Sequence, residues 1–323
     1  MPLLKVNIDG PGIADAAATR AALDATLAGL PPDAPILVLI HGYKHSPFSP
    51  ANDPHTHILS LAPRPCWKAV SWPGLLGLGQ DGARPEPPRP EPSRPEPLCI
   101  ALGWHARGTL WQAYGRAAQA GIALADLSAL IRARRPGAAL HVLAHSLGAR
   151  VALAALPHMA PGAMGRAVLL AAAETHGRAA AFLATPAGRR TEVLNVTSRE
   201  NAVFDRMLEW LVAPHGWGDR ALGTPHASGR ARIGHPAARW LDMAIDDAAT
   251  RAALAAIGVT VSPPDRRICH WSVYLRPGLF DLYRPLLTGA LPFARLRALL
   301  PAPETAADRA GPALAPGVLP IPR

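Results

Sequence analysis

The stretch with the clearest chemical potential is residues 140–150, where an apolar run meets a His-Ser-Leu-Gly sequence and an alanine-rich stretch follows. A serine hydroxyl becomes a useful nucleophile when a sharp turn between a strand and a helix exposes it and points it at a base. Small residues must flank such a turn because the strand and the helix pass close together, and Ala144 and Gly148 fill those places. We therefore expect Ser146 to be a nucleophile for acyl chemistry. The alternative is that Ser146 caps the helix that follows it.

The sequence around Ser146 resembles the nucleophile elbow of the α/β-hydrolase family. That family usually has glycine where this chain has Ala144, a mild departure because alanine is also small. The resemblance implies an α/β fold, the α/β-hydrolase fold, with a mostly parallel central sheet and helices on both faces. It also implies a serine hydrolase that cleaves an ester or related acyl bond through a Ser-His-acid triad and an acyl-enzyme, without a cofactor.

The oxyanion loop of the family has a counterpart in His41-Gly42-Tyr43, which directly follows the apolar run 36–40. Attack on a carbonyl creates a negatively charged oxygen, and fixed N–H donors must already point at it. We expect the main-chain N–H groups of Tyr43 and Leu147 to be these donors, while Gly42 lets the loop approach closely. The alternative is an ordinary turn at the end of a strand.

The resemblance also guides the choice of base and acid, because the family order is serine, acid, histidine. Histidine has a pKa near neutrality, and of the thirteen histidines His270 lies at the family's position, late in the chain. Glu200 lies at the turn after the expected strand 191–198, and Asp205 lies one helical turn further on. Asn201 occupies the place where many relatives carry aspartate, and an amide cannot offer an imidazolium a full negative charge. Glu200 is therefore the first candidate acid and Asp205 the second, although either carboxylate could instead complement a helix dipole.

The elements that must position these residues follow from the spacing of apolar side chains. The expected strands cover 3–8, 36–40, 67–72, 140–145, 166–171, 191–198 and 240–245, with a short strand-to-loop segment at 267–274. The expected helices cover 13–30, 104–135, 151–156, 177–189, 207–212, 248–257 and 279–287.

We expect one α/β-hydrolase domain over residues 1–300, interrupted twice. A tandem Arg-Pro-Glu-Pro repeat makes 81–98 a proline-rich insert loop, because such proline density disfavours both helix and sheet. Residues 214–236 are rich in Gly, Pro and His and form an irregular cap or loop excursion, and 301–323 form a disordered tail. The alternative for the insert is a docking segment for a protein partner.

Composition argues against several other classes of protein. The net charge is +10, but arginine is scattered along the chain without a basic stripe, which argues against a nucleic-acid partner. The three cysteines lack metal-type spacing, and the loop that carries His55 and His57 has no matching cluster, so no metal is expected. No signal peptide and no uncharged apolar run of membrane-spanning length are apparent. These features predict a cytoplasmic protein, and the resemblance to α/β-hydrolases implies a small-molecule acyl substrate.

Two other functions share these features. An acyltransferase would use the same scaffold with an alcohol or an amine in place of water. A catalytically degenerate scaffold would only bind partners, and both Asn201 and the proline repeat keep this alternative open. The tryptophans Trp67, Trp72, Trp104 and Trp271 are candidates either for lining an apolar acyl pocket or for the core.

Overall fold

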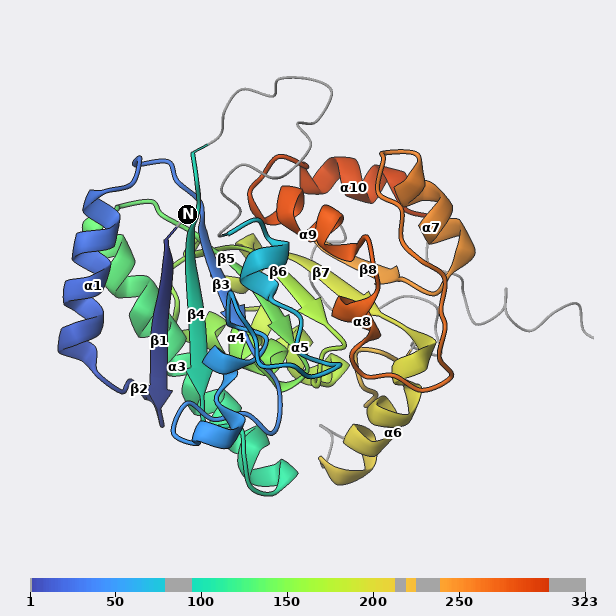
Figure 1. The fold of residues 1–323 in the computed structure, drawn as a ribbon, viewed down its shortest axis with the longest axis horizontal. Helices are drawn as coiled ribbons and strands as arrows, with labels where there is room; N and C mark the ends of the chain where they lie inside the picture. Colours follow the sequence, from blue (N-terminus) through green and yellow to red (C-terminus); the bar gives the residue numbers. More distant parts are fainter. Residues whose placement is uncertain (1, 79–94, 213–218, 225–238, 302–323) are drawn as a thin grey trace, which may run out of the picture.

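The computed structural model describes residues 2–78, 95–212, 219–224 and 239–301. Within these residues the chain forms one sheet of eight strands in the order β2-β1-β4-β3-β5-β6-β7-β8, flanked by helices (Figure 1). Strands β1 and β2 pair antiparallel, and the other neighbours pair parallel. The expected α/β class with a mostly parallel sheet is therefore confirmed, and the strand order is consistent with that of α/β-hydrolases.

The strands are β1 (Leu3–Asp9), β2 (Gly12–Ile13), β3 (Ile36–Ile40), β4 (Leu98–Trp104), β5 (Leu140–His145), β6 (Met164–Leu170), β7 (Glu192–Thr197) and β8 (Trp240–Ala244). The α-helices are α1 (Ala16–Ala28), α2 (Trp72–Leu75), α3 (Leu110–Arg134), α4 (Leu147–Ala155), α5 (His176–Leu183), α6 (Ala202–Leu211), α7 (Ala248–Ala255), α8 (Ser272–Leu275), α9 (Leu279–Leu287) and α10 (Phe293–Leu299).

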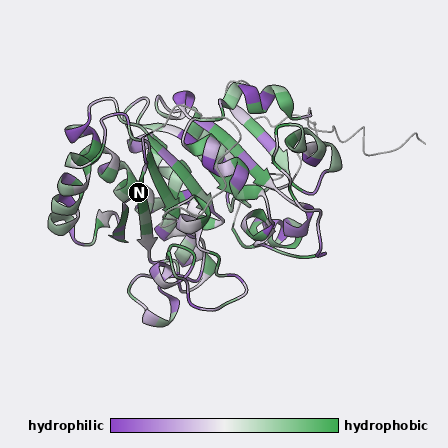
Figure 2. Cartoon of the chain, turned by 45° about the horizontal axis from the view of Figure 1, so that its top comes forward, coloured by the Kyte–Doolittle hydropathy of each residue, from purple (hydrophilic) through white to green (hydrophobic). Residues whose placement is uncertain are grey.

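Strand β3 shows why the central strands read as unbroken apolar runs. Its side chains alternate between two hydrophobic cores, with Val38 in the core under α1, α3, α4 and α5 and Leu39 in the core under α2 and α7 to α10. Both faces of the sheet are thus covered, and hydrophobic residues are concentrated on its strands (Figure 2). A strand buried on both faces cannot tolerate polar side chains on either, which produces a continuous run instead of an alternating one.

The expected strand at 67–72 is wrong. Between β1 and β3 lies β4 instead, and no element was expected over residues 99–103, with Leu98 placed in the insert and Trp104 in the next helix. Residues 67–71 are turns and irregular chain, and Trp72 begins the short helix α2. All seven residues of β4 are buried, which suits a position between β1 and β3. Helix α3 begins later than expected, at Leu110, because Thr109 and Gln112 form a capping box there.

The remaining expectations concern the segment 267–274, the insert, the excursion and the tail. The segment 267–274 contains no strand, and its last residues belong to α8. Most of the proline-rich insert 81–98, most of the excursion 214–236, and residues 302–323 of the expected tail lie outside the described residues. The described part of the excursion contacts the domain, since Leu222 N–H donates to Glu174 O at 2.9 Å. No helix in the described ranges is long and apolar enough to cross a membrane.

The parallel strands end along one edge of the sheet, towards which β1 and β4 point downwards in Figure 1. The segments after β3, β5 and β7 leave from this edge, and they carry the Gly42 loop, Ser146 and Asn201 respectively. Loops at the carboxyl ends of parallel strands are the usual place for sites in such sheets. The fold therefore gathers the candidate residues at one end of the molecule.

Candidate active site

Ser146 lies at the turn between β5 and α4 with φ 55° and ψ −122°. Residues other than glycine seldom adopt positive φ, so surrounding contacts must hold this backbone. Two of them are the Ser146 N–H, which donates to Leu170 O at 2.9 Å, and the Ser146 carbonyl, which accepts from Ala173 N–H at 3.1 Å. The Ser146 hydroxyl makes no capping hydrogen bond to α4. The alternative that Ser146 is an ordinary helix cap therefore finds no support.

Strained backbone is concentrated at this edge of the sheet. The non-glycine residues with positive φ in the described chain are Lys44 (75°), Ser146 (55°) and Ala171 (45°). They follow the carboxyl ends of β3, β5 and β6, and these three strands lie side by side in the sheet. Strain of this kind persists where the surrounding structure enforces it, and it clusters at functional sites.

Two glycines allow the loop after β3 to touch the turn at Ser146. A Cβ atom on Gly42 would lie 2.8 Å from Ser146 Cβ, and a Cβ on Gly148 would lie 2.6 Å from Ile40 O and 2.7 Å from His41 O. Contacts this short with backbone atoms do not occur without displacement of one of the segments. Gly42 and Gly148 thus set the distance between the loop and the nucleophile candidate.

Replacing Gly148 by alanine is expected to lower the free energy of unfolding by about 1–3 kcal/mol, because the new methyl group overlaps backbone oxygens in a packed region. It should also displace the Gly42 loop. Gly115→Ala is the matched control: Gly115 is exposed in α3 with nothing within 4 Å of its Cβ position, so alanine should stabilise the helix by about 1 kcal/mol. Urea denaturation of both variants checks this, and equal effects of the two substitutions would contradict it.

The proposed oxyanion donors are available. Among the described residues, the N–H groups of Tyr43 and Leu147 have no protein acceptor. Leu147 is the first residue of α4, where backbone N–H groups lack partners within the helix and the helix dipole is positive. Tyr43 lies directly after Gly42, which contacts Ser146. Two unpaired donors from different segments thus lie beside the serine.

His41 fixes the orientation of the Tyr43 donor. The His41 Nε2 atom accepts from Trp104 N–H at 3.0 Å, so Nδ1 carries the proton and donates to Gly42 O at 2.8 Å. The carbonyl of Gly42 and the N–H of Tyr43 belong to one trans peptide and point in opposite directions. Burial and the neighbouring His45 hold the pKa of His41 well below its usual value. His41 thus stays neutral and keeps this arrangement.

His270 lies in the loop before α8, with its ring 4.6 Å from the ring of Phe204 and 4.6 Å from that of His145. His145 precedes the nucleophile candidate, and its Nε2 lies 3.1 Å from His270 O. Burial lowers the pKa of His270 well below its usual value, and the charges of His145 and Lys68 lower it further. The imidazole is therefore neutral at neutral pH, the form that can accept a proton.

Ser146 and His270, which the sequence singled out, are brought to the same end of the sheet. They are connected through His145, which is adjacent to Ser146 in the chain and in contact with His270. No hydrogen bond joins the Ser146 hydroxyl to His270 in the part of the chain that the structure describes. Such hydrogen bonds are often long without substrate and shorten when it binds.

The residue that contacts the Nδ1 atom of His270 is Asn201, whose Oδ1 lies 2.6 Å away. The first candidate acid, Glu200, instead forms a buried ion pair with Arg276 at 2.5 Å, and its other carboxylate oxygen accepts from Arg266 N–H at 3.2 Å. The expected direct contact between Glu200 and the base is therefore corrected. The Glu200 carboxylate instead pairs with the buried guanidinium of Arg276, which is close to it only in the folded chain.

Asp205, the second candidate acid, lies behind Asn201. Its Oδ1 accepts from Asn201 Nδ2 at 2.9 Å, and both side chains are buried. The expected direct contact between Asp205 and His270 is replaced by a chain of hydrogen bonds from His270 to Asn201 to Asp205. The sequence did identify position 201 as the family's place for the acid, but its amide directed attention to the carboxylates nearby.

Burial raises the pKa of Asp205 to about 7, and the nearby charge of Glu209 contributes to this, while the hydrogen bond from Asn201 opposes it. The folded-state pKa thus exceeds the unfolded one, so the stability that this group contributes is present below about pH 4 and is lost as the pH rises through about 7. We expect Asp205→Asn to unfold at the same denaturant concentration as the wild type near pH 4 and to be more stable by up to about 4 kcal/mol near pH 8. Denaturation series across this range check the sign; an Asp205→Asn variant that is less stable near pH 8 would contradict it.

A buried charged network, which was not predicted from the sequence, lies near the turn at Ser146. Arg150, one helical turn after Ser146, is paired with Glu174, which also accepts from Tyr114 Oη at 2.5 Å and from Thr175 N–H at 2.9 Å. Glu174 is completely buried. The network links α4 to α3 and to the segment after β6, which helps to hold the strained turn.

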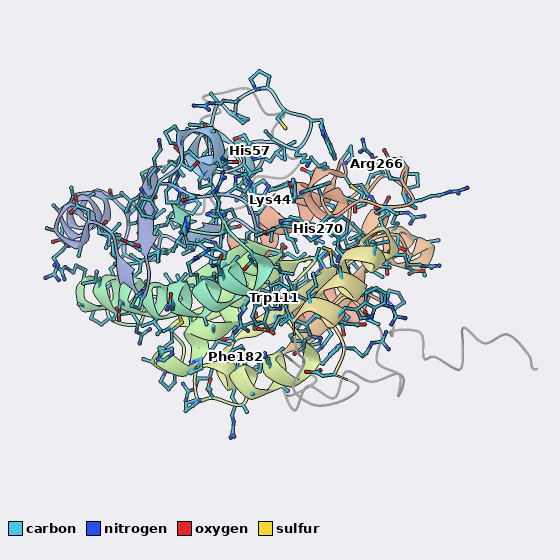
Figure 3. All side chains as sticks on the ribbon, turned by 90° about the horizontal axis from the view of Figure 1, so that it is seen from below. Lys44, His57, Trp111, Phe182, Arg266 and His270 are labelled. Atoms are coloured by element: carbon cyan, nitrogen blue, oxygen red, sulfur yellow. The ribbon has the colours of Figure 1, made fainter. Side chains whose placement is uncertain are left out.

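The surroundings of His270 are aromatic and cationic. Trp271 packs against Trp67 at 5.2 Å between ring centroids, and Lys68 Nζ lies 3.8 Å from the Trp271 centroid. In contrast, Trp72 and Trp104 are buried in the core, as one of the two expectations for them had it, whereas Trp67 is exposed. Figure 3 views the molecule from the carboxyl ends of the parallel strands, with His270 and Lys44 near the middle of the picture.

A cavity of about 250 Å³ adjoins the loop after β3. It is lined by Tyr43, Lys44, Asn52, Arg107 and Gly108. The Tyr43 hydroxyl donates to Gly108 O at 2.5 Å and so joins the loop after β3 to the start of α3. The cavity thus lies beside the segment that follows Gly42.

No protein-family model matches this chain, and no curated protein sequence matches it either. An α/β fold of this kind supports many unrelated functions. The function has to be inferred from the arrangement of the site residues themselves.

Proposed function

We propose that this protein is a serine hydrolase with the α/β-hydrolase fold that cleaves an ester or related acyl bond. The observation that carries the proposal is the strained backbone of Ser146, at φ 55° and ψ −122°, with a hydroxyl that caps no helix. Strain without a capping function is explained when the turn serves to present the hydroxyl. The N–H groups of Tyr43 and Leu147, which have no acceptor among the described residues, support the same interpretation.

In the proposed reaction, Ser146 Oγ attacks the carbonyl carbon of the substrate while His270 Nε2 accepts the hydroxyl proton. The carbonyl oxygen becomes an oxyanion, which accepts hydrogen bonds from the N–H groups of Tyr43 and Leu147. The carbon–oxygen bond to the leaving group then breaks, and His270 returns the proton to the departing alcohol. Water attacks the resulting acyl-enzyme by the same steps and releases the acid and free Ser146.

Asn201 takes part in this proposal by accepting the Nδ1–H of His270. That hydrogen bond fixes the ring and leaves Nε2 free to act as the base. The amide is neutral, so it stabilises the imidazolium less than a carboxylate would. An amide at the position where the family carries an acid also favours a second candidate function, a binding scaffold that has lost catalysis.

A panel of p-nitrophenyl esters from acetyl to dodecanoyl distinguishes the two functions. The hydrolase predicts a burst of p-nitrophenol equal to the enzyme concentration, followed by slower turnover, as expected for an acyl-enzyme. The aromatic rings around His270 lead us to expect a preference for apolar acyl groups. Absence of turnover above background for every ester would favour the scaffold.

A further inference from the structure

The amide of Asn201 can face His270 in two ways, and only one of them suits a base. A rotation of the amide by 180° exchanges the carbonyl oxygen Oδ1 with the nitrogen Nδ2 at nearly the same positions. The oxygen accepts a hydrogen bond from His270 Nδ1–H, whereas the nitrogen would require Nδ1 without a proton. In the second case the proton of the neutral ring lies on Nε2, so Nε2 cannot accept a proton from Ser146.

Asp205 selects the first orientation. Asp205 follows Asn201 by four residues, so both side chains lie on the same side of the first turn of α6. An ionised carboxylate only accepts hydrogen bonds, so the Asn201 nitrogen must face Asp205, where the distance is 2.9 Å. The Asn201 oxygen then faces His270 Nδ1, at 2.6 Å.

Burial makes this selection effective. Asn201 is 2% exposed and Asp205 is 4% exposed, so bulk water has little access to these side chains in either orientation of the amide. A flipped amide would place its oxygen against the carboxylate, leaving two buried acceptors in contact without a proton between them. Unsatisfied buried polar groups are costly, so the observed orientation is strongly favoured while Asp205 is ionised.

We infer that Asp205 is a positioning residue, which sets the tautomer of His270 through the Asn201 amide and so keeps Nε2 available to Ser146. The catalytic consequence rests on the proposed function, whereas the tautomer itself does not. In this arrangement the Asp205 carboxylate orients the His270 imidazole through Asn201, without contacting the imidazole itself. Asn201 and Asp205 together perform the orienting part of the role usually given to the triad acid.

The test compares Asp205→Asn with the double variant Asn201→Asp/Asp205→Asn, at about pH 8, where the Asp205 carboxylate is ionised. In the single variant the new amide can donate to Asn201 Oδ1, which permits the flip. In the double variant the carboxylate at position 201 faces His270 Nδ1, and a carboxylate accepts hydrogen bonds in any orientation. The number of charged groups is the same as in the wild type. Both variants preserve side-chain volume.

We expect Asp205→Asn to lower kcat/KM by about tenfold to a hundredfold, less than the roughly ten-thousandfold loss known for a wrong tautomer at a triad histidine, because the flip is permitted but not enforced. The double variant should recover kcat/KM to within about threefold of the wild type. Nitrogen-15 NMR of histidine-labelled protein provides a readout independent of activity. The His270 signals, assigned by comparison with His270→Gln, should report Nδ1–H in the wild type and the double variant and a mixture in Asp205→Asn.

Asp242→Asn is the matched control. Asp242 accepts a hydrogen bond from the Asn195 amide at 2.9 Å, so this pair reproduces the Asp–Asn chemistry on neighbouring strands β7 and β8. Its removal should leave both the His270 tautomer and kcat/KM unchanged.

The outcomes separate the inference from the proposed function. If Asp205→Asn retains wild-type kcat/KM and a pure Nδ1–H tautomer, the inference is overturned even when ester hydrolysis depends on Ser146. If no variant hydrolyses esters but Asp205→Asn alone shows the mixed tautomer, the inference stands and the proposed function fails. A double variant that folds and shows the mixed tautomer would also overturn the inference, because an acceptor at position 201 would then be insufficient.

Discussion

Replacing Ser146 by alanine is expected to lower kcat for ester hydrolysis on the order of a millionfold, the loss typical when one member of a cooperating triad is removed. Without the Oγ atom no acyl-enzyme forms, and the remaining rate comes from binding and from the oxyanion donors acting on water. The fold should be preserved, because the hydroxyl makes no capping bond that alanine would remove. KM should change little, since the hydroxyl adds little to ground-state binding.

Steady-state kinetics on the best ester of the panel measures this effect, with His270→Ala and the double variant for comparison. The two single losses should be similar in size and should not add, because serine and histidine act as a unit. Ser128→Ala is the control, since Ser128 Oγ is buried in α3 without a hydrogen-bond partner among the described residues. A Ser146→Ala variant that keeps more than about a hundredth of wild-type kcat would contradict the mechanism.

Replacing Glu200 by glutamine is expected to destabilise the protein by about 3–5 kcal/mol, because it leaves the buried charge of Arg276 without a counter-ion. The Arg276 guanidinium also donates to Ile245 O at 2.8 Å, so it has no route to solvent without distorting the end of β8. Glu200 O accepts from Cys269 N–H at 2.9 Å, next to His270. Loss of the ion pair should therefore also loosen the loop that carries the base.

Denaturant unfolding and kinetics together assign the role of Glu200. Below its unfolding transition, Glu200→Gln should keep kcat within about tenfold of the wild type, because its carboxylate does not contact the imidazole. Glu200→Met combined with Arg276→Met removes both charges and should be less destabilising than Glu200→Gln alone. A loss of about ten-thousandfold in kcat with unchanged stability would instead identify Glu200 as the acid of a triad.

The sequence predicted best the features that are encoded locally. The turn at Ser146 and the loop at Gly42 each join a buried strand to a short contiguous motif, so their positions follow from neighbouring residues. Strand β4 was missed because its apolar run directly follows the proline repeat, and its neighbours β1 and β3 are far away in the sequence.

The acid could not be chosen from the sequence because the choice depends on distant partners. Arg276 is 76 residues away from Glu200 in the sequence, yet it forms the ion pair that keeps this carboxylate away from His270. His270 is 69 residues away from Asn201, and their hydrogen bond gives the amide its place at the base. Residue type alone favoured a carboxylate at that place, whereas the fold pairs an amide with a second carboxylate behind it.

Labelling with a fluorophosphonate followed by intact-mass and peptide analysis tests most directly whether Ser146 is an activated nucleophile. This probe forms a covalent bond with a serine oxygen that a neighbouring base has activated. We predict one adduct per chain, located on Ser146, formed much more slowly in His270→Ala and absent from Ser146→Ala. Native, folded protein that acquires no adduct on Ser146, or that acquires it at the same rate without His270, would contradict the account.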